Sequence, residues 1–157
     1  MGSSANRDIL LQVLNAFQDI DAIVVAPIES HLRKTDIIPN NVYVTSWLPA
    51  LDVTKMVDMA VIHGGQGTVQ TTVAAGVPFV GIGMQPEQEL NIYLYVKFGN
   101  ALQLSKKHLK AEKIKYAINA VLNDESYHLK AQEAKTLLTS VDVKEVIKDI
   151  VIKETNG

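Results

Sequence analysis

The sequence predicts an α/β fold in which helices cover both faces of a parallel sheet. Three observations support this prediction: short β-branched runs alternate with amphipathic segments, glycine or proline follows several of the runs, and 47% of the 157 residues are hydrophobic while 20% are charged. This length and composition fit one compact domain with a sizeable core. Strands and helices alternate in this way when right-handed crossovers place helices on both sides of a sheet.

The predicted elements follow one another without a repeat or a linker. A helix is expected over residues 6–19, because Ile9, Val13 and Phe17 recur at helical spacing. Five apolar runs read as strands, the first two of them buried, at residues 22–26, 42–45, 59–62, 79–82 and 101–104. Further helices are expected at residues 49–57, 67–75, 87–98, 111–122, 124–140 and 143–151.

One feature does not fit a complete domain of this type. A Gly-Ser turn at residues 2–3 and the helix at 6–19 come before the first predicted strand. Because the first strand of a doubly wound sheet is usually central, we expect an open slot inside the sheet. We therefore expect residues 1–157 to be a single domain excised from a longer polypeptide.

Charge and cysteine content exclude several classes of protein. The formal net charge of −2 gives no general attraction to nucleic acid or to an anionic membrane. The absence of cysteine excludes disulfides, thiolate metal sites and a cysteine nucleophile. The apolar runs are too short to span a membrane, and the N-terminus has no apolar signal region. We expect a soluble, cytoplasmic chain that recognises any phosphate locally.

The most informative stretch is residues 61–68, VIHGGQGT, at the end of a predicted strand and the start of a predicted helix. Ligands of open α/β sheets bind at this edge. Gly64, Gly65 and Gly67 let backbone amides approach a phosphate closely, and the helix N-terminus adds N–H donors. His63 adds one directional donor. The alternative is a plain strand-to-helix turn that needs glycine only for its dihedral angles.

Further motifs stand before and after this turn. Trp47-Leu48-Pro49 precedes it, and Gly76-Val77-Pro78, Glu87-Gln88 and Asn91 follow it. Their order and spacing resemble the donor-binding signature of UDP-glycosyltransferases, including plant secondary-product and bacterial macrolide enzymes. The resemblance covers residues 2 to about 138. It implies the Rossmann-like, C-terminal half of a GT-B glycosyltransferase.

The resemblance also implies a role for individual residues in binding a UDP- or dTDP-sugar, which is a co-substrate and not a resident cofactor. Trp47 would stack on the nucleobase while the backbone around Leu48 reads the base edge. Glu87 and Gln88 match the pair that contacts the sugar hydroxyls. The residues expected to hold the diphosphate are His63, Gly65, Gly67 and Thr68, with Ser3 approaching from the other side.

Several of these residues also have plainer interpretations. Trp47 can fill an edge of the core, Glu87 can be an ordinary acid in the first turn of a helix, and Ser3 can belong to a cloning remnant. Thr71 stands where the plant enzymes carry a glutamate that binds the ribose hydroxyls. The choice between UDP and dTDP is therefore open.

The resemblance implies direct displacement with inversion at the anomeric carbon, without a protein-bound metal. The general base and the acceptor pocket belong to the family's N-terminal domain, which we expect as a partner in the same polypeptide. We therefore expect no catalytic residue in this chain and no turnover by it alone. Three alternatives stay open: a half-enzyme that works with a separate acceptor-binding subunit, a catalytically silent nucleotide-binding module, and an epimerase fragment with Glu87 as its one candidate acid.

Overall fold

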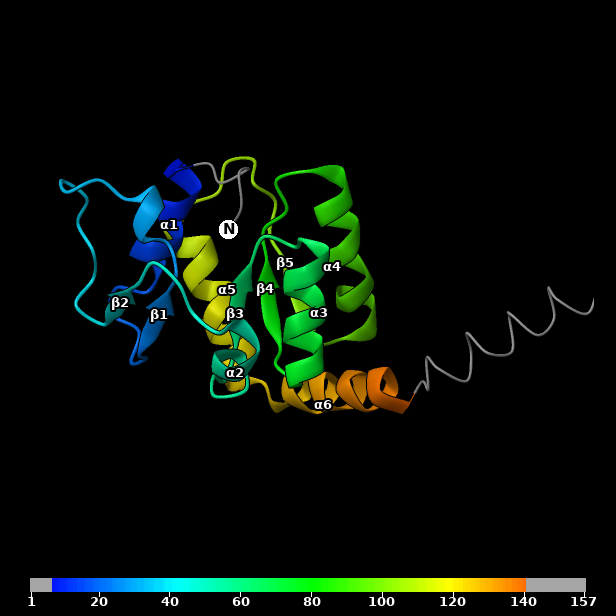
Figure 1. Cartoon of the computed structure of the whole chain (residues 1–157). Coiled ribbons are helices and arrows are strands. Elements are labelled where there is room, and N and C mark those ends of the chain that lie inside the picture. Colours follow the sequence, from blue (N-terminus) through cyan, green and yellow to red (C-terminus); the bar gives the residue numbers. More distant parts are fainter. Residues whose placement is uncertain (1–6, 141–157) are drawn as a thin grey trace, which may run out of the picture.

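The computed structural model describes residues 7–140 and shows an α/β fold (Figure 1). Strands alternate with helices along these residues as predicted. In chain order the elements are α1 (Arg7–Ala16), β1 (Val24–Ala26), the 3-10 helix η1 (Glu29–His31), β2 (Val42–Val44), α2 (Ala50–Thr54), β3 (Ala60–Ile62), α3 (Gln66–Ala75), β4 (Phe79–Gly81), α4 (Pro86–Phe98), β5 (Ala101–Gln103), α5 (Ala111–Asn123) and α6 (Glu125–Ser140). The helix expected at 143–151 and the predicted site residue Ser3 lie outside the described residues.

The strands within residues 7–140 form two parallel sheets. In one sheet β1 pairs with β2, so that Val25 lies opposite Tyr43. In the other sheet β4 lies between β3 and β5, and Val80 is opposite both Val61 and Leu102. Parallel pairing throughout agrees with the predicted class, because helices provide the crossovers that parallel strands need.

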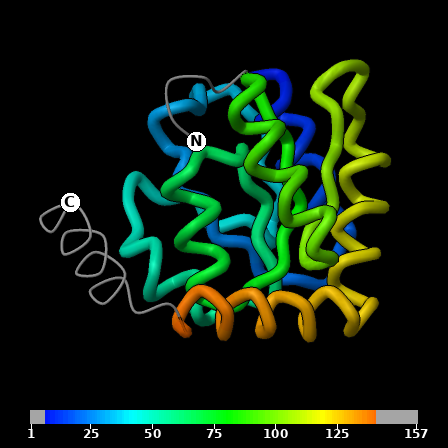
Figure 2. Tube along the Cα trace, turned by 90° about the vertical axis from the view of Figure 1, so that its right-hand side faces the viewer, coloured from blue at the N-terminus to red at the C-terminus, as the bar shows by residue number. Residues whose placement is uncertain are grey.

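The β3–β4–β5 sheet is covered on both faces. Phe79 of β4 packs with Ile92 of α4 on one face, and Val80 packs with Val121 of α5 on the other; all four side chains are fully buried. Helix α6 crosses the amino-terminal edge of this sheet (Figure 2), where the Gln132 amide donates to the Gly76 carbonyl at 2.9 Å. The core of the domain therefore surrounds this sheet.

Helix α1 packs against both sheets. Its Leu10 and Leu14 side chains lie in a cluster with the β1–β2 sheet. Its Ile9 and Val13 side chains lie in a second cluster that includes Ile118 of α5 and the partly buried Val61 of β3. A single amphipathic helix therefore links the two sheets, as its helical periodicity allows.

The prediction that the first two strands are buried is wrong for one of their faces. Val25 is 44% exposed and Tyr43 is 61% exposed, whereas the neighbouring side chains of both strands pack against α1. The crossover from β1 to β2 contains only the three-residue helix η1. It therefore does not provide an amphipathic helix long enough to cover the second face.

The strands form two separate sheets, whereas the sequence predicted one sheet with an open interior slot whose position it did not fix. Within residues 7–140, no strand pairs with the second edge of β1 or of β3. Val24 and Ala26 form the backbone hydrogen bonds to the β2 side, and the two neighbours of Val61 form those to the β4 side. Because backbone groups alternate in direction along a strand, the N–H and C=O groups of Val25 and Val61 face the unpaired edges.

This alternation predicts a specific pattern of amide hydrogen exchange. The amides of Val25 and Val61 should exchange with D2O at least about tenfold faster than the amide of Val80, because unpaired edge amides need no opening of the sheet. NMR-detected exchange of the uniformly 15N-labelled chain measures all three rates in one sample. Equal protection of the three amides would contradict the divided sheet.

Candidate functional site

Within residues 7–140, the predicted site residues lie in the loops that leave the carboxyl ends of the strands or in the first turns of the helices that follow these loops. Residues 63–65 follow β3, residues 82–85 follow β4, and Trp47 lies on the loop that follows β2. Because the strands within each sheet are parallel, the loops after β3, β4 and β5 leave the same edge. This is the edge at which open α/β sheets bind ligands.

The loop after β3 is a sharp turn that leads directly into helix α3. Gly64 has a φ of 80°, in the left-handed region that favours glycine. Gly65 is the N-cap of α3, and the first bond inside this helix is donated by the Val69 N–H to the Gly65 carbonyl. The N–H groups that precede Val69 in the first turn have no partner inside the helix. Apart from its chain neighbours and the helix backbone, no heavy atom of residues 7–140 lies within 4 Å of a Cβ built at Gly67, so the start of the helix is open on this side.

His63 lies beside this open helix start. A Cβ built at Gly65 would lie 2.6 Å from the imidazole Nε2, so only glycine leaves room for the ring in this position. Burial lowers the pKa of His63 below its ordinary value. The ring is therefore neutral near pH 7, with one nitrogen donating and the other accepting.

Helix α4 packs directly against the turn. The side-chain amide of Asn91 donates to the Gly64 carbonyl, with 3.0 Å between Nδ2 and O. The sequence motif places Asn91 one turn beyond Gln88 on the same face of this helix, but it does not predict the contact with Gly64.

The loop after β4 is held by two side chains. Gln88 is buried, and its Oε1 accepts the Met84 N–H at 2.9 Å. Lys106, from the loop after β5, donates to the Met84 carbonyl at 2.5 Å. Glu87 lies in the first turn of α4 and is exposed. Glu87 is therefore accessible to a ligand, while any contact of Gln88 with a ligand must use its N–H2 group or follow a change in this loop.

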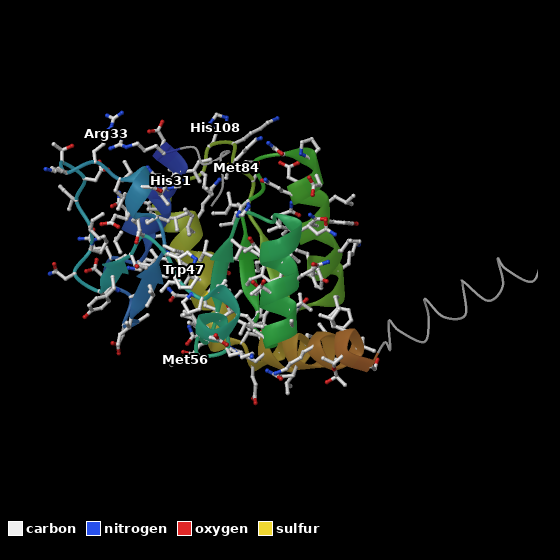
Figure 3. All side chains as sticks on the ribbon, viewed as in Figure 1. His31, Arg33, Trp47, Met56, Met84 and His108 are labelled. Carbon is white, nitrogen blue, oxygen red and sulfur yellow. The ribbon has the colours of Figure 1, made fainter. Side chains whose placement is uncertain are left out.

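Trp47 lies on the loop after β2, which belongs to the other sheet. Its side chain is 73% exposed, so the interpretation that it fills an edge of the core is wrong. In the view of Figure 3, Trp47 lies between the β1–β2 sheet and the β3–β4–β5 sheet. Among residues 7–140, no hydrogen bond or ring contact joins it to the His63 turn. Leu48, next to it, is partly buried.

Two further features bear on what the site can bind. The Thr71 hydroxyl donates to the Gly67 carbonyl at 2.9 Å, so it is engaged inside α3. Within the described range, no group of three or more His, Asp or Glu side chains is placed to hold a metal ion.

A hollow of about 430 Å³ lies away from the loops that carry the predicted site residues. It lies between the end of α1 and residues 37–41, at the amino-terminal edge of β1 and β2.

Comparison with known proteins gives a family and a fold. A family model described as the C-terminal domain of erythromycin biosynthesis protein CIII-like proteins matches residues 11–152. UDP-glycosyltransferase 2 of Phaeomoniella chlamydospora is 32% identical over 152 residues, which cover 91% of this chain and 32% of the relative. Human UDP-glucuronosyltransferase 3A2 is 33% identical over 141 residues, which cover 86% of this chain and 26% of the relative. The chain thus spans about a quarter to a third of the length of these relatives.

Solved structures share the fold at lower identity. The glycosyltransferase VinC, solved in complex with dTDP, superposes with a TM-score of 0.82 at 22% identity and covers 94% of this chain and 38% of its own. The calicheamicin glycosyltransferase CalG4 superposes with a TM-score of 0.79 at 21% identity, with the same coverage. Both likenesses show a GT-B glycosyltransferase fold for this domain. No helix within residues 7–140 is long and apolar enough to cross a membrane.

The lowered pKa of His63 predicts how stability depends on pH. The pKa of His63 in the folded chain lies below its unfolded value of about 6.5, so the unfolded chain takes up the proton at a higher pH than the folded chain does. The free energy of unfolding therefore falls as the pH falls from about 6.5 toward the folded pKa. The variant His63→Gln should therefore lose less stability than the wild type between pH 7.5 and pH 5. Urea midpoints at the two pH values measure the difference, with His108→Gln, an exposed histidine of another loop, as the matched control. If the stability of His63→Gln depends on pH as that of the wild type does, burial of the His63 ring does not contribute to this pH dependence.

Proposed function

The chain belongs to the erythromycin biosynthesis protein CIII-like C-terminal domain family of glycosyltransferases, and from this premise we propose that it binds the nucleotide-sugar donor of an inverting sugar transfer. One observation supports the proposal above the others: the open N-terminus of α3 follows a glycine turn, with the His63 ring beside it. This arrangement presents N–H donors and a favourable helix dipole to an anion at the carboxyl edge of the sheet.

In this proposal the diphosphate lies against the first turn of α3. The N–H groups of Gly65, Gly67 and Thr68 donate to its oxygens, and the neutral His63 ring donates one further hydrogen bond. Ser3, which lies outside the described residues, would approach from the other side. A dTDP complex of a protein with this fold supports the choice of ligand class. Both UDP and dTDP stay candidates, because the carboxylate expected at position 71 is replaced by a threonine.

In this proposal the nucleobase and the sugar of the ligand lie on either side of the diphosphate. The exposed indole of Trp47 offers a flat surface for stacking, and the backbone near Leu48 would read the base edge. The carboxylate of Glu87 is accessible and would accept hydrogen bonds from the sugar hydroxyls. Gln88 would contribute its N–H2 group while its Oε1 continues to hold Met84.

The chemical contribution of this chain is to stabilise the leaving group. As the acceptor hydroxyl attacks the anomeric carbon, the bond to the diphosphate breaks and negative charge grows on the phosphate oxygens. Fixed N–H donors and the His63 N–H oppose this charge without reorganising, which is how oxyanion sites act. The nucleotide sugar is a co-substrate in this proposal, and the chain requires no resident cofactor.

The acceptor and the general base belong to another part of the enzyme. We propose that residues 1–157 form a single donor-binding domain and that an N-terminal acceptor-binding domain of the same polypeptide completes the active site. The chain covers only about a quarter to a third of the length of its relatives, which supports this proposal. A separate acceptor-binding subunit or a catalytically silent nucleotide-binding module are the alternative functions. A cytoplasmic location stays a prediction from the cysteine-free sequence.

Calorimetric titration of the chain with dTDP and with UDP tests the binding proposal. We expect saturable binding of at least one of them, and His63→Ala should weaken it about tenfold or more, because a hydrogen bond to a charged group contributes about 1.5–3 kcal/mol. His108→Ala is the matched control and should bind like the wild type. Absence of binding to either nucleotide, or equal affinity of His63→Ala, would refute this site.

The role of Glu87 is tested by comparing a nucleotide sugar with its nucleotide. Glu87→Gln should weaken UDP-glucose about fivefold or more relative to UDP, because a charge-assisted acceptor of the sugar hydroxyls is lost. Glu89→Gln removes an exposed acid of the same helical turn and serves as the control. Equal weakening of UDP-glucose and UDP would place Glu87 outside the sugar subsite.

A further inference from the structure

We infer that Asn91 is a positioning residue for the diphosphate: by holding the Gly64 carbonyl, it sets the direction of the Gly65 N–H. This inference rests on the proposed function, because the Gly65 N–H is one of the donors assigned to the diphosphate. Asn91 acts through the turn and not by touching the ligand. It lies on α4, 27 residues along the chain from Gly64, which belongs to the turn before α3.

The geometry of the peptide group carries the first step of the argument. The Gly64 carbonyl and the Gly65 N–H belong to the same planar trans peptide, so the two groups point in opposite directions. The Asn91 Nδ2 atom lies 3.0 Å from the Gly64 oxygen and fixes that carbonyl toward α4. The Gly65 N–H is thereby directed away from α4.

The second step is that this peptide needs an external restraint. It joins two glycines, and glycine resists a rotation of the backbone less than any other residue. A reversed peptide would present a carbonyl oxygen to the diphosphate in place of an N–H donor. The hydrogen bond from Asn91 opposes that reversal, and it is partly shielded from competing water by the side chains around it.

The third step is that close packing fixes the position from which Asn91 donates. A Cβ built at Gly64 would lie 2.6 Å from the Gln88 carbonyl and from Cδ1 of Ile92. A Cβ built at Gly81 would lie 2.5 Å from Cγ2 of Ile92, which is fully buried. The α4 backbone therefore lies against both the turn and β4, and Asn91 has little freedom to move away from Gly64.

A comparison of nucleoside diphosphate with nucleoside tests this inference. Asn91→Leu keeps a side chain of similar size and removes the donor, while Asn123→Ala removes an amide that also donates to a helix carbonyl, at the exposed end of α5. The probes are UDP with uridine and dTDP with thymidine, titrated by NMR. We expect Asn91→Leu to weaken the diphosphate about tenfold and the nucleoside less than about twofold, because only the diphosphate uses the Gly65 N–H. Asn123→Ala should change neither.

Equal weakening of nucleoside and diphosphate by Asn91→Leu would show a general structural role and overturn the inference. Unchanged affinity for the diphosphate would overturn it as well. If the wild-type chain binds no nucleotide, the proposed function fails, and a measurement without ligand still decides the geometric claim. The residual dipolar coupling of the Gly65 N–H should change in Asn91→Leu while that of the Val80 N–H does not; an unchanged Gly65 coupling contradicts the assigned restraint.

Discussion

The close approach of α4 to the sheet is the constraint on which the candidate site depends. Ile92 occupies the space that a side chain at Gly64 or Gly81 would need, so both positions must lack a Cβ. This packing brings the start of α4, with Glu87, to the same edge as the turn after β3. The turn after β3 and the start of α4 therefore form one closely packed unit, which is held by a hydrogen bond from Asn91 to Gly64 and one from Met84 to Gln88.

The electrostatics of this unit differ from those of a basic phosphate site. The chain carries a net charge of −2, and His63 is kept neutral near pH 7 by burial. Attraction for an anion must then come from main-chain N–H groups and the dipole of α3, which act over a short range. Such a site favours a ligand that fits closely over one that is merely charged. The net charge predicted only that any phosphate recognition would be local, and this arrangement is consistent with that prediction.

The divided sheet has a consequence for the two halves of the proposed ligand site. Trp47 follows a strand of the β1–β2 sheet, whereas His63 follows a strand of the β3–β4–β5 sheet. Within residues 7–140 the two sheets share no hydrogen-bonded strand pair, and α1 packs against both. The distance between a stacked base and a bound diphosphate therefore depends on how α1 holds the two sheets together.

Local patterns were enough to predict the five strands, the helices between them and the glycine turn at residues 63–65. These features depend on periodicity and on turn residues that are neighbours in the chain, which is why sequence reasoning recovers them. The exposed face at Tyr43, the exposure of Trp47 and the bond from Asn91 to Gly64 could not be predicted in the same way. Each depends on which segments meet after folding: no helix within residues 7–140 buries the Val25 and Tyr43 side of β1 and β2, and α4 packs against a turn 27 residues away. Sequence patterns therefore identified the chemical groups, and long-range packing decided which of them are exposed and which hold another in place.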